Sequence, residues 1–580
     1  MDKGQVAAVL EDIGNLLELT GASPFEARAY ANAARTISGL ESDINELVAT
    51  GTIASVPGLG KTLAARVTEL VTTGQLAFHN ELIEKVPPGL RQMLRIPGLG
   101  PKRIRVIHES LGVTTLDELK SAAETGQIAT LPGFGAKSQG NILQGLLFLA
   151  EHQDKFRYDH AEVAARAIEE QLRALPQVVR LDVAGSIRRH KEICKDMDIV
   201  ASVARDEDRV PVMDTLASLP EVEAVTGKGE TKTSVVLKMG MAVDLRVVLD
   251  DEYPYLLHHF TGSKDHNHAL RSAAHARGIK INEYGIFQGD QRIPCKDEVD
   301  FYRALGMQYV EPELREDMGE IQAALKGELP ILVTEADLRG ILHVHSSWSD
   351  GGATIREMAE AARELGADYL GMCDHSQAAA YAGGLNPAAV RRQQDEIDRL
   401  NDEYAGRFRI LKGTECDILK DGALDYDDKT LASFDFVVAS IHSNFELPPA
   451  EQTKRLLRAL ENPYCSILGH PTGRILLERP GYAPDLEAVI ERAGELGVCI
   501  EINADPHRLD LDWRLVHRAA ERGVRIPICP DAHSPAGLRN MRYGVGIGRK
   551  GWLSRADVLN CLPTADLIAF FQEQRTRRGV

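Results

Sequence analysis

The chain has 580 residues, with 85 acidic and 67 basic side chains and a formal net charge of −18. This length exceeds one ordinary core, so two or more domains are expected, and the composition is that of a globular protein. No apolar run reaches the ~18 residues that a membrane span needs, so a membrane protein is excluded. The N-terminus is polar and acidic and does not resemble a signal peptide, so a cytoplasmic location is expected.

A short pattern recurs three times near the N-terminus, at 56–67 (VPGLGKTLAARV), 96–107 (IPGLGPKRIRVI) and 131–142 (LPGFGAKSQGNI). The glycines permit a tight turn, and the helix that follows points free N–H groups back toward it, which suits a phosphate oxygen. One copy would be an ordinary turn, but three copies resemble helix-hairpin-helix motifs, which bind DNA backbones without reading sequence. The candidate DNA-binding residues are Gly58, Gly60, Lys61, Gly98, Gly100, Lys102, Gly133, Gly135 and Lys137.

Helices and strands alternate from about 155 to 250, which indicates an α/β unit. Asp196 and Asp198 stand two apart at the head of an apolar strand, so both carboxylates face one side, and Asp244 on another strand could complete a triad. Taken alone, such a pair is more often a solvated strand end. Carboxylates of this kind suit Mg²⁺ or Mn²⁺ held together with substrate phosphates.

A Gly185-Ser186 turn and Arg189 precede the carboxylates and offer N–H, hydroxyl and guanidinium donors to a triphosphate. Together with FTGSKDHNHALRSAAHARGIKINEYGIF at 260–287, they give residues 1–318 a pattern that resembles a family X DNA polymerase of the DNA polymerase beta type. The resemblance implies that Asp196, Asp198 and Asp244 are catalytic metal ligands. It implies that the nucleotide, a deoxynucleoside triphosphate, is bound by Gly185, Ser186, Arg189, His259, Phe260, Gly262, Asn267 and Arg271.

The chain departs from that family at one position. Members that remove a 5′-deoxyribose phosphate use a Schiff-base lysine in the first helix-hairpin-helix helix, where this chain has Arg66. Arginine stays protonated and forms no imine at neutral pH. Lys61 lies one turn away, and a second basic position falls on Glu26. Little lyase activity is therefore expected.

Strands and helices alternate regularly from 334 to 580, a pattern typical of a parallel sheet or barrel whose active site lies at the carboxyl ends of the strands. The first strand, ILHVH, carries two histidines at i and i+2, which face the same side of a strand. Six of the seven predicted strands end in His, Glu or Asp. The ligand-type residues so collected are His343, His345, Asp350, His375, Glu415, His442, His470, Asp531 and His533.

Imidazole and carboxylate together suit Zn²⁺, Mn²⁺ or Fe²⁺, and nine ligands predict a cluster of two or three ions, here taken as Zn²⁺ or Mn²⁺. The same motifs resemble the polymerase and histidinol phosphatase (PHP) family, which implies a (β/α)₇ barrel with a trinuclear site. By that resemblance Glu415 bridges two ions. One ion adds His343, His345 and Asp531, the second adds His442 and His533, and the third is held by Asp350, His375 and His470, although the family often has His where this chain has Asp350.

The expected architecture is multidomain: a helical helix-hairpin-helix region, an α/β nucleotidyltransferase palm, a small α+β nucleotide-binding subdomain and a TIM-like (β/α)₇ PHP barrel. The expected boundaries are 1–85, 86–152, 153–252, 253–318, a linker at 319–333, and 334–580.

The expected function is gap filling in DNA repair, such as base excision repair, with a metal-dependent 3′-5′ exonuclease or phosphoesterase cleaning 3′ ends. Two alternatives stay open: a PHP domain acting as an independent small-molecule phosphatase, and a non-catalytic protein that binds DNA ends.

Overall fold

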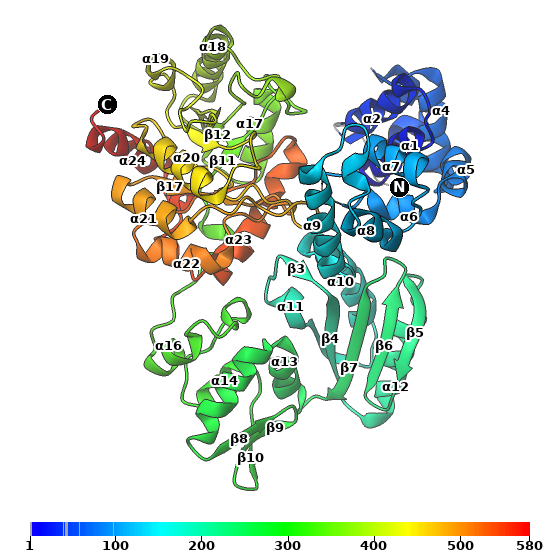
Figure 1. Ribbon diagram of the computed structural model, residues 1–580. Coiled ribbons are helices and arrows are strands. Elements are labelled where there is room, and N and C mark those ends of the chain that lie inside the picture. Colours follow the sequence, from blue (N-terminus) through cyan, green and yellow to red (C-terminus); the bar gives the residue numbers. More distant parts are fainter. Residues whose placement is uncertain (1–2, 39, 41–43, 57, 97) are drawn as a thin grey trace. The chain divides into compact units, whose positions relative to one another are not determined.

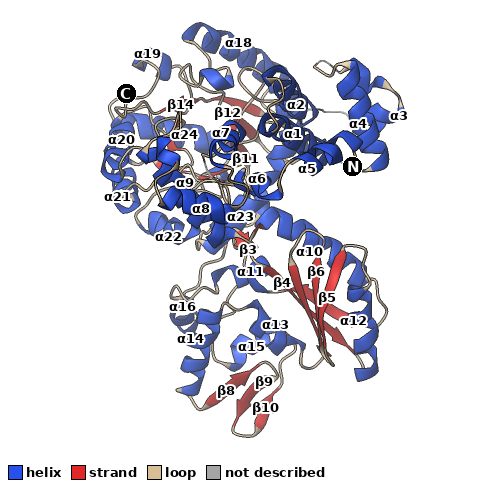
Figure 2. Ribbon diagram, turned by 45° about the vertical axis from the view of Figure 1, so that its right-hand side comes forward, coloured by secondary structure: helices blue, strands red, loops and turns tan. Residues whose placement is uncertain are grey.

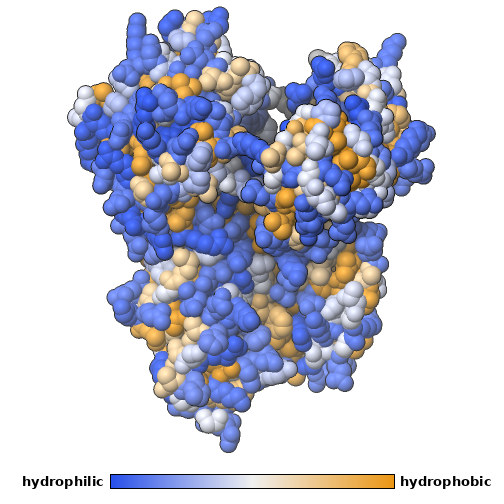
Figure 3. Space-filling model, viewed as in Figure 1, coloured by the Kyte–Doolittle hydropathy of each residue, from blue (hydrophilic) through white to orange (hydrophobic). Residues whose placement is uncertain are grey.

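The computed structural model describes residues 3–38, 40, 44–56, 58–96 and 98–580, which fall into two compact units, residues 1–153 and 154–580 (Figure 1). None of the described helices is both long and apolar enough to cross a membrane. All eight cysteines lie in the described residues and are buried free thiols. On the face drawn in Figure 3, hydrophilic residues dominate and hydrophobic ones form scattered groups.

The described residues of the first unit form helices joined by loops and turns (Figure 2). One apolar core runs through it, from Leu10 and Val67 to Ile104 and Leu149. The predicted boundary between residues 85 and 86 is therefore not a break in packing, because Leu82 and Leu90 lie in that same core. The helices are α1 Lys3–Leu19, α2 Pro24–Ser38, α3 Ile44–Ala49, η1 Thr52–Ser55, α4 Lys61–Thr73, α5 Ala77–Lys85, α6 Pro88–Met93, α7 Pro101–Leu111, α8 Leu116–Glu124, η2 Ile128–Thr130 and α9 Ala136–His152.

The second unit begins with a five-stranded sheet in the order β2-β4-β7-β6-β5, in which β4 and β7 are parallel and the other neighbours antiparallel. Helices α10 and α12 cover one face of the sheet, and α13 covers the other through Leu256 and Leu257. The elements are β1 Phe156–Arg157, α10 Tyr158–Arg173, β2 Val178–Val183, α11 Gly185–Arg188, β3 Ile193–Cys194, β4 Asp196–Val203, η3 Asp206–Asp208, α12 Arg209–Ala217, β5 Val222–Lys228, β6 Lys232–Leu237 and β7 Ala242–Leu249.

A small α+β part follows, with its own core around Phe301 and Tyr302. The predicted linker is not a free connection: it contains α16, whose Ile321 and Ala324 lie in this core, and Glu320 is fully buried against His266. The elements are α13 Tyr253–Thr261, α14 Lys264–His275, β8 Ile279–Asn282, β9 Gly285–Gln288, β10 Gln291–Ile293, α15 Glu298–Ala304, η4 Pro312–Leu314 and α16 Glu320–Lys326.

Parallel strands form the centre of residues 334–580. Strands β11, β12 and β13 pair in that order, as do β14 to β17 and β18 with β19; single bridges His375–Glu415 and Val344–Ala532 join the three groups. The elements are η5 Glu335–Asp337, β11 Gly340–Val344, α17 Ile355–Glu364, β12 Tyr369–Met372, η6 Ala380–Ala382, α18 Pro387–Tyr404, β13 Arg409–Lys412, β14 Glu415–Asp417, α19 Asp428–Leu431, β15 Val438–Ser440, α20 Pro449–Glu461, β16 Ile467–Leu468, α21 Leu486–Leu496, β17 Cys499–Ile500, β18 Ile502–Asn503, α22 Trp513–Glu521, β19 Ile528–Cys529, η7 Pro535–Asn540, α23 Met541–Lys550, η8 Leu559–Cys561 and α24 Thr564–Arg577.

A buried cluster fills the space between these strands, and α24 closes it from one side, because Phe571 stacks on Phe436 at 5.2 Å between ring centroids. Seven of the strands in residues 334–580, which are described throughout, each contribute one residue to this cluster: β11, β12, β13, β15, β16, β17 and β19. These members are Leu342, Tyr369, Leu411, Val438, Ile467, Cys499 and Cys529.

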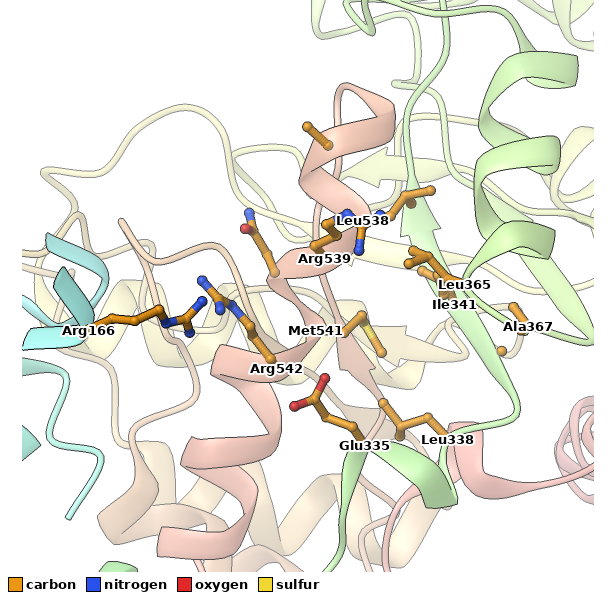
Figure 4. Close-up of a pocket in the computed structure, with 14 residues that line it drawn as sticks. Arg166, Glu335, Leu338, Ile341, Leu365, Ala367, Leu538, Arg539, Met541 and Arg542 are labelled. Atoms are coloured by element: carbon orange, nitrogen blue, oxygen red, sulfur yellow. The ribbon is translucent and has the colours of Figure 1, made fainter. Parts of the chain in front are cut away.

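The five-stranded sheet and the C-terminal strands share one continuous apolar core within the second unit. Helix α10 meets α23 where Glu162 accepts from Arg542. A cavity of about 590 Å³ lies at this junction, and Figure 4 shows Arg166 and Arg542 reaching toward one another across it. None of the predicted metal ligands lines this cavity, so it is separate from the candidate sites.

Candidate active sites

The three aspartates of the first candidate site lie on two adjacent parallel strands. Asp196 opens β4, and Asp198 stands directly opposite Asp244 of β7 in the register. Two neighbours hold Asp244: Ser234 donates to its Oδ1 at 2.6 Å, and Lys232 Nζ lies 2.7 Å from its Oδ2. Lys232, on β6, was missed by sequence reasoning, since nothing in the order of residues places it beside Asp244.

The carboxyl of Asp198 is electrostatically unfavourable without a cation. Burial raises its pKa, and the nearby Asp196 and Asp244 raise it further, to about 7. Clustered carboxylates of this kind are relieved by a divalent cation, so the donor set fits Mg²⁺ or Mn²⁺.

Gly185 is required by its contact with Asp198. It has a φ of +60°, and a Cβ added there would lie 2.5 Å from Asp198 Oδ2. The backbone of the Gly-Ser turn therefore passes directly against the acidic cluster, as a residue with a side chain could not.

A cavity of about 400 Å³ adjoins the aspartates. Asn267 Nδ2 donates to the backbone oxygen of His259 at 2.8 Å, which ties α14 to α13 on one side of the cavity. Lys264 also lines it and was not singled out from the sequence. Every predicted nucleotide-binding residue lines this cavity: Gly185, Ser186, Arg189, His259, Phe260, Gly262, Asn267 and Arg271.

Among the nine ligand-type residues of the C-terminal half, five histidines surround Glu415, which is 1 % exposed. Its carboxylate lies 3.0 Å from His375 Nδ1, 3.1 Å from His442 Nε2 and 2.8 Å from His470 Nε2. His343 Nε2 and His345 Nε2 follow at 3.4 and 3.7 Å. Asp531 Oδ1 lies 3.2 Å from His345 Nε2. Three groups have ligand atoms within 4.8 Å of one another: His345, Asp350, His375 and His533; His343, His345 and Glu415; and His375, Glu415 and His442.

The geometry differs from the predicted grouping of ligands at two histidines, since His470 and His533 exchange places. His533 Nε2 lies 3.3 Å from Asp350 Oδ1, because the loop that carries Asp350 follows β11, and β11 lies beside β19. His470 lies against Glu415 instead of Asp350. The ring order of the strands decides this arrangement, and the sequence does not contain it.

The donor set of this cluster fits metal ions. Imidazole nitrogens of four of its histidines are buried without a hydrogen-bond partner, namely His343 Nε2, both nitrogens of His345, His375 Nδ1 and His470 Nδ1. Buried polar atoms without partners are rare, and imidazole nitrogens that lack a hydrogen-bond partner are available to bind a cation. His343, His470 and Asp531 also adopt positive φ values of 60°, 21° and 50°, a strained conformation that is concentrated at functional sites.

Charge within the cluster is shared between carboxylates and imidazoles. Burial lowers the pKa of His442, but Glu415 and Asp417 outweigh it and raise the pKa to about 9. The pKa of His533 is likewise raised to about 9, by Asp350 and Asp531 against burial. His345 differs: burial, together with His533 and His375, lowers its pKa to about 3. Without metal, several imidazoles thus carry protons that balance the carboxylates.

Several residues that sequence reasoning missed support or border the cluster. Glu501 accepts from His343 Nδ1 at 2.7 Å and from the backbone N–H of His470 at 2.6 Å, which leaves His343 Nε2 to face the cluster. Asp417 does the same for His442 Nδ1 at 2.7 Å. The signal for Glu501 was present, because a carboxylate within the apolar strand VCIEINA has to be partnered when buried.

Two side chains of other chemistry lie at the rim of the cluster. Arg508 Nε is 3.6 Å from Asp531 Oδ2. The ring of Tyr381, 73 % exposed, lies 6.4 Å from that of His375.

The repeated glycine turns of the first unit have the geometry expected of them. Gly58, Gly98 and Gly133 have φ values of +88°, +75° and +80°. Gly60, Gly100 and Gly135 are the N-caps of α4, α7 and α9. No described atom would lie within 4 Å of a Cβ added at Gly98, Gly100, Gly133 or Gly135, so these turns are open to a ligand. Lys61, Lys102 and Lys137 are exposed beside them; Pro57 and Pro97 of the motifs lie outside the described residues.

Arg66 has a packing role. Its guanidinium lies 3.6 Å from the centre of the Phe78 ring and 5.4 Å from that of Tyr30. A cation stacked in this way is held in place and directed at aromatic faces.

Comparison with known proteins covers nearly the whole chain. Residues 1–76 match a helix-hairpin-helix domain, 90–146 a SAM-like helix-hairpin-helix tandem, 256–316 a DNA polymerase beta thumb and 342–505 a PHP domain. The chain is 39 % identical over 576 residues to the DNA polymerase/3'-5' exonuclease PolX of Bacillus subtilis. The aligned region covers 99 % of this chain and 100 % of that protein.

Two further relatives match part of the chain. A probable phosphatase of Syntrophotalea carbinolica is 32 % identical over 201 residues, 34 % of this chain and 77 % of its own. DNA polymerase lambda of Rattus norvegicus is 24 % identical over 314 residues, 49 % of this chain and 52 % of its own. With a thumb, helix-hairpin-helix domains and a PHP domain on one chain, and a full-length relative, this protein belongs to the family X DNA polymerases that carry a C-terminal PHP domain.

Proposed function

We propose that the chain is a DNA-directed DNA polymerase that fills short gaps in DNA repair, and that its PHP domain is a metal-dependent 3′-5′ exonuclease or phosphoesterase that cleans 3′ ends. The observation that carries this proposal is the presence of two distinct clusters on one chain: carboxylates beside a cavity on the palm, and a histidine–carboxylate cluster on the C-terminal strands. The full-length relative from Bacillus subtilis bears the names of both activities.

At the polymerase site, Asp196, Asp198 and Asp244 would hold Mg²⁺ or Mn²⁺, which supplies positive charge to the reacting phosphates. Ser186, Arg189 and the backbone of Gly185 would bind the triphosphate, since all three line the cavity beside Asp198. His259, Phe260 and Gly262 would border the sugar, and Asn267 and Arg271, one turn apart on α14, would cover the base pair.

At the PHP site, the strands of residues 334–580 would form a (β/α)₇ barrel, and the nine ligands at their carboxyl ends would hold two or three ions, Zn²⁺ or Mn²⁺. When bound, these ions activate water against phosphorus. Glu415, which lies within 3.7 Å of nitrogens of five histidines, would balance most of their charge. Arg508 would receive a DNA phosphate, and Tyr381 would stack on the terminal base.

DNA would be held by the three glycine turns of the first unit, whose helix N-termini and exposed lysines suit phosphate oxygens. Because such contacts reach the backbone, binding would be independent of sequence and would weaken as salt rises.

The decisive experiment uses two substrates on the full chain. Extension of a primer across a one-nucleotide gap tests the polymerase, and release of label from a 3′-labelled strand tests the PHP site, with wild type and His343→Ala compared. We expect wild type to do both and His343→Ala to lose release alone. No extension by wild type would leave DNA-end binding as the function. Cleavage of a small phosphoester but not of DNA would favour the phosphatase alternative, which the match to a probable phosphatase supports.

Metal uptake at the PHP site is expected to release protons and to strengthen with pH. His442 and His533 have pKa values of about 9 without metal, so both are protonated at pH 7 and must lose that proton to bind a cation. The apparent affinity for Mn²⁺ should therefore rise from pH 6 to about pH 9. Calorimetric titration in two buffers of different ionisation heat measures the release. Binding that is independent of both buffer and pH would contradict the assigned ligands.

Little 5′-deoxyribose phosphate lyase activity is expected, because Arg66, stacked on Phe78, occupies the place of the nucleophile. Borohydride trapping on a nicked abasic substrate measures it directly. A strong adduct in wild type that disappears in Lys61→Ala would show that Lys61 has taken over the role.

A further inference from the structure

A lysine of the PHP half is buried against the polymerase half within the second unit. Lys550, the last residue of α23, has a side chain with no exposed surface. Its Nζ donates to Glu316 Oε1 at 2.5 Å and to the backbone oxygen of Arg189 at 3.0 Å. The ammonium also lies 4.4 Å from the centre of the Trp513 ring on α22. A fully buried lysine is uncommon and requires partners of this kind.

Glu316 joins this lysine to the nucleotide site. The carboxylate oxygen that accepts from Lys550 also accepts from Arg189 Nε at 3.0 Å, and Lys191 Nζ lies 3.9 Å from the other oxygen. Burial raises the pKa of Glu316, but Lys550 and Arg189 outweigh it and the pKa is lowered, so the carboxylate is charged. Three cations share this one anion.

The loop between the Gly-Ser turn and the aspartates is held against the same two helices. His190 lies so close to α23 that a Cβ added at Gly546 would be 2.5 Å from its Nδ1. Glu192 accepts from Trp513 Nε1 at 3.0 Å and lies 3.3 Å from Arg514 of α22. Arg189, His190 and Glu192 therefore pack against helices α22 and α23 of the PHP half. Arg189 also lines the cavity beside Asp198.

We propose that Lys550 is a positioning residue of the polymerase site: through Glu316 and the backbone of Arg189, the PHP half sets where the Arg189 guanidinium stands and how firmly it is held. The inference rests on the proposed role of Arg189 in binding the triphosphate. With Lys550 in place, Glu316 and the backbone oxygen of Arg189 are both fixed by one buried ammonium, and Glu316 in turn holds the guanidinium at the cavity. Without Lys550, Glu316 and this backbone oxygen lose their common partner, and the guanidinium is placed less firmly for a phosphate.

Lys550→Met keeps the length of the side chain and removes the charge. We expect the KM for the incoming nucleotide to rise about tenfold, with a smaller effect on kcat, because binding of the triphosphate is weakened while the aspartates remain in place. Hydrolysis at the PHP site should stay within about twofold of wild type, since Lys550 contacts none of its ligands.

Arg549→Met is the matched control. Arg549 precedes Lys550 on α23 and also pairs across the same junction, with Glu313 Oε1 at 2.6 Å, but it has no contact with Arg189 or Glu316. It should leave the KM within about twofold of wild type. An equal rise in Arg549→Met and Lys550→Met would mean general loosening of the junction and would overturn the proposal.

Arg189→Ala and Glu316→Gln complete the set. If Arg189→Ala leaves the KM unchanged, the proposed triphosphate role fails; if it raises the KM while Lys550→Met does not, the Lys550 proposal alone fails. Should Lys550→Met not fold, Glu316→Gln carries the test: a raised KM supports the relay, and an unchanged KM overturns it. The Lys550→Met/Glu316→Gln pair should be clearly less than additive, because both changes interrupt one connection.

Discussion

Asp198→Ala is expected to lower nucleotide addition by about a thousandfold or more while 3′-end hydrolysis stays near the wild-type rate. Asp198 lies opposite Asp244 and directly beneath the Gly-Ser turn, so its loss would remove a proposed cation ligand at the point where the triphosphate would lie. The PHP ligands stand on other strands and do not contact it, and distant sites act independently.

The control is Asp206→Ala, which removes an exposed carboxylate beyond the other end of β4 and should change neither activity. Primer extension and release of 3′ label on the same preparations give both readouts. Loss of both activities in a folded Asp198→Ala protein would contradict the assignment of two separate sites.

The same aspartate gives a pH-dependent effect on stability. The pKa of Asp198 is raised to about 7 in the fold, above its ordinary value of about 4, so the free energy of unfolding falls as pH rises from about 4 to 7 and the full loss remains above pH 7. In metal-free buffer at pH 8, Asp198→Asn should therefore stabilise the fold by about 1 kcal/mol, a figure discounted for solvent screening. Thermal unfolding at pH 8 and pH 5 measures it, and an equal effect at both would contradict the raised pKa.

Glu415→Ala is expected to abolish 3′-end hydrolysis and to remove most of the bound metal, while polymerisation continues. Glu415 is the central carboxylate of the cluster, and without it adjacent cations would repel one another in a poorly hydrated site. From the sequence, His470→Ala is the comparison expected to leave a partly working cluster. In the structure His470 stands against Glu415, so the peripheral position passes to His533, whose side chain is 40 % exposed.

His533→Ala should accordingly lose one ion and retain some hydrolysis, and His470→Ala should resemble Glu415→Ala more closely. Metal analysis of the purified variants, beside their hydrolysis rates, separates these outcomes. A wild-type metal content in Glu415→Ala would mean that Glu415 holds no ion, and the cluster would need reassignment.

Features that depend on a few neighbouring residues could be predicted from the sequence. The glycine turns follow from Pro-Gly-x-Gly before an amphipathic helix, and the pairing of Asp196 with Asp198 follows from the two-residue period of a strand. His343 and His345 both reach the cluster, with ring centroids 5.3 Å apart. The strand register shifts between Ile341 and Val344, so the regular alternation of side chains along a strand does not fully explain why both histidines face the cluster.

Features that depend on which elements become neighbours could not be predicted. The exchange of His470 and His533 depends on the order of strands, and the salt bridge from Lys232 to Asp244 depends on β6 lying beside β7. The segment 319–333 reads as a linker in the sequence, but its helix α16 packs in the core, where Glu320 is buried against His266.

The continuous core of the second unit has a consequence for dissection of the molecule. A break near residue 333 would strip apolar surface from α10 and α23 together and separate Lys550 from Glu316 and from the backbone of Arg189. Separate expression of the halves would therefore yield poorly folded fragments that aggregate through exposed apolar surface. Loss of activity in such fragments would reflect this misfolding and not the loss of a catalytic residue. Point substitutions, which leave this shared core intact, are therefore the means of separating the two activities.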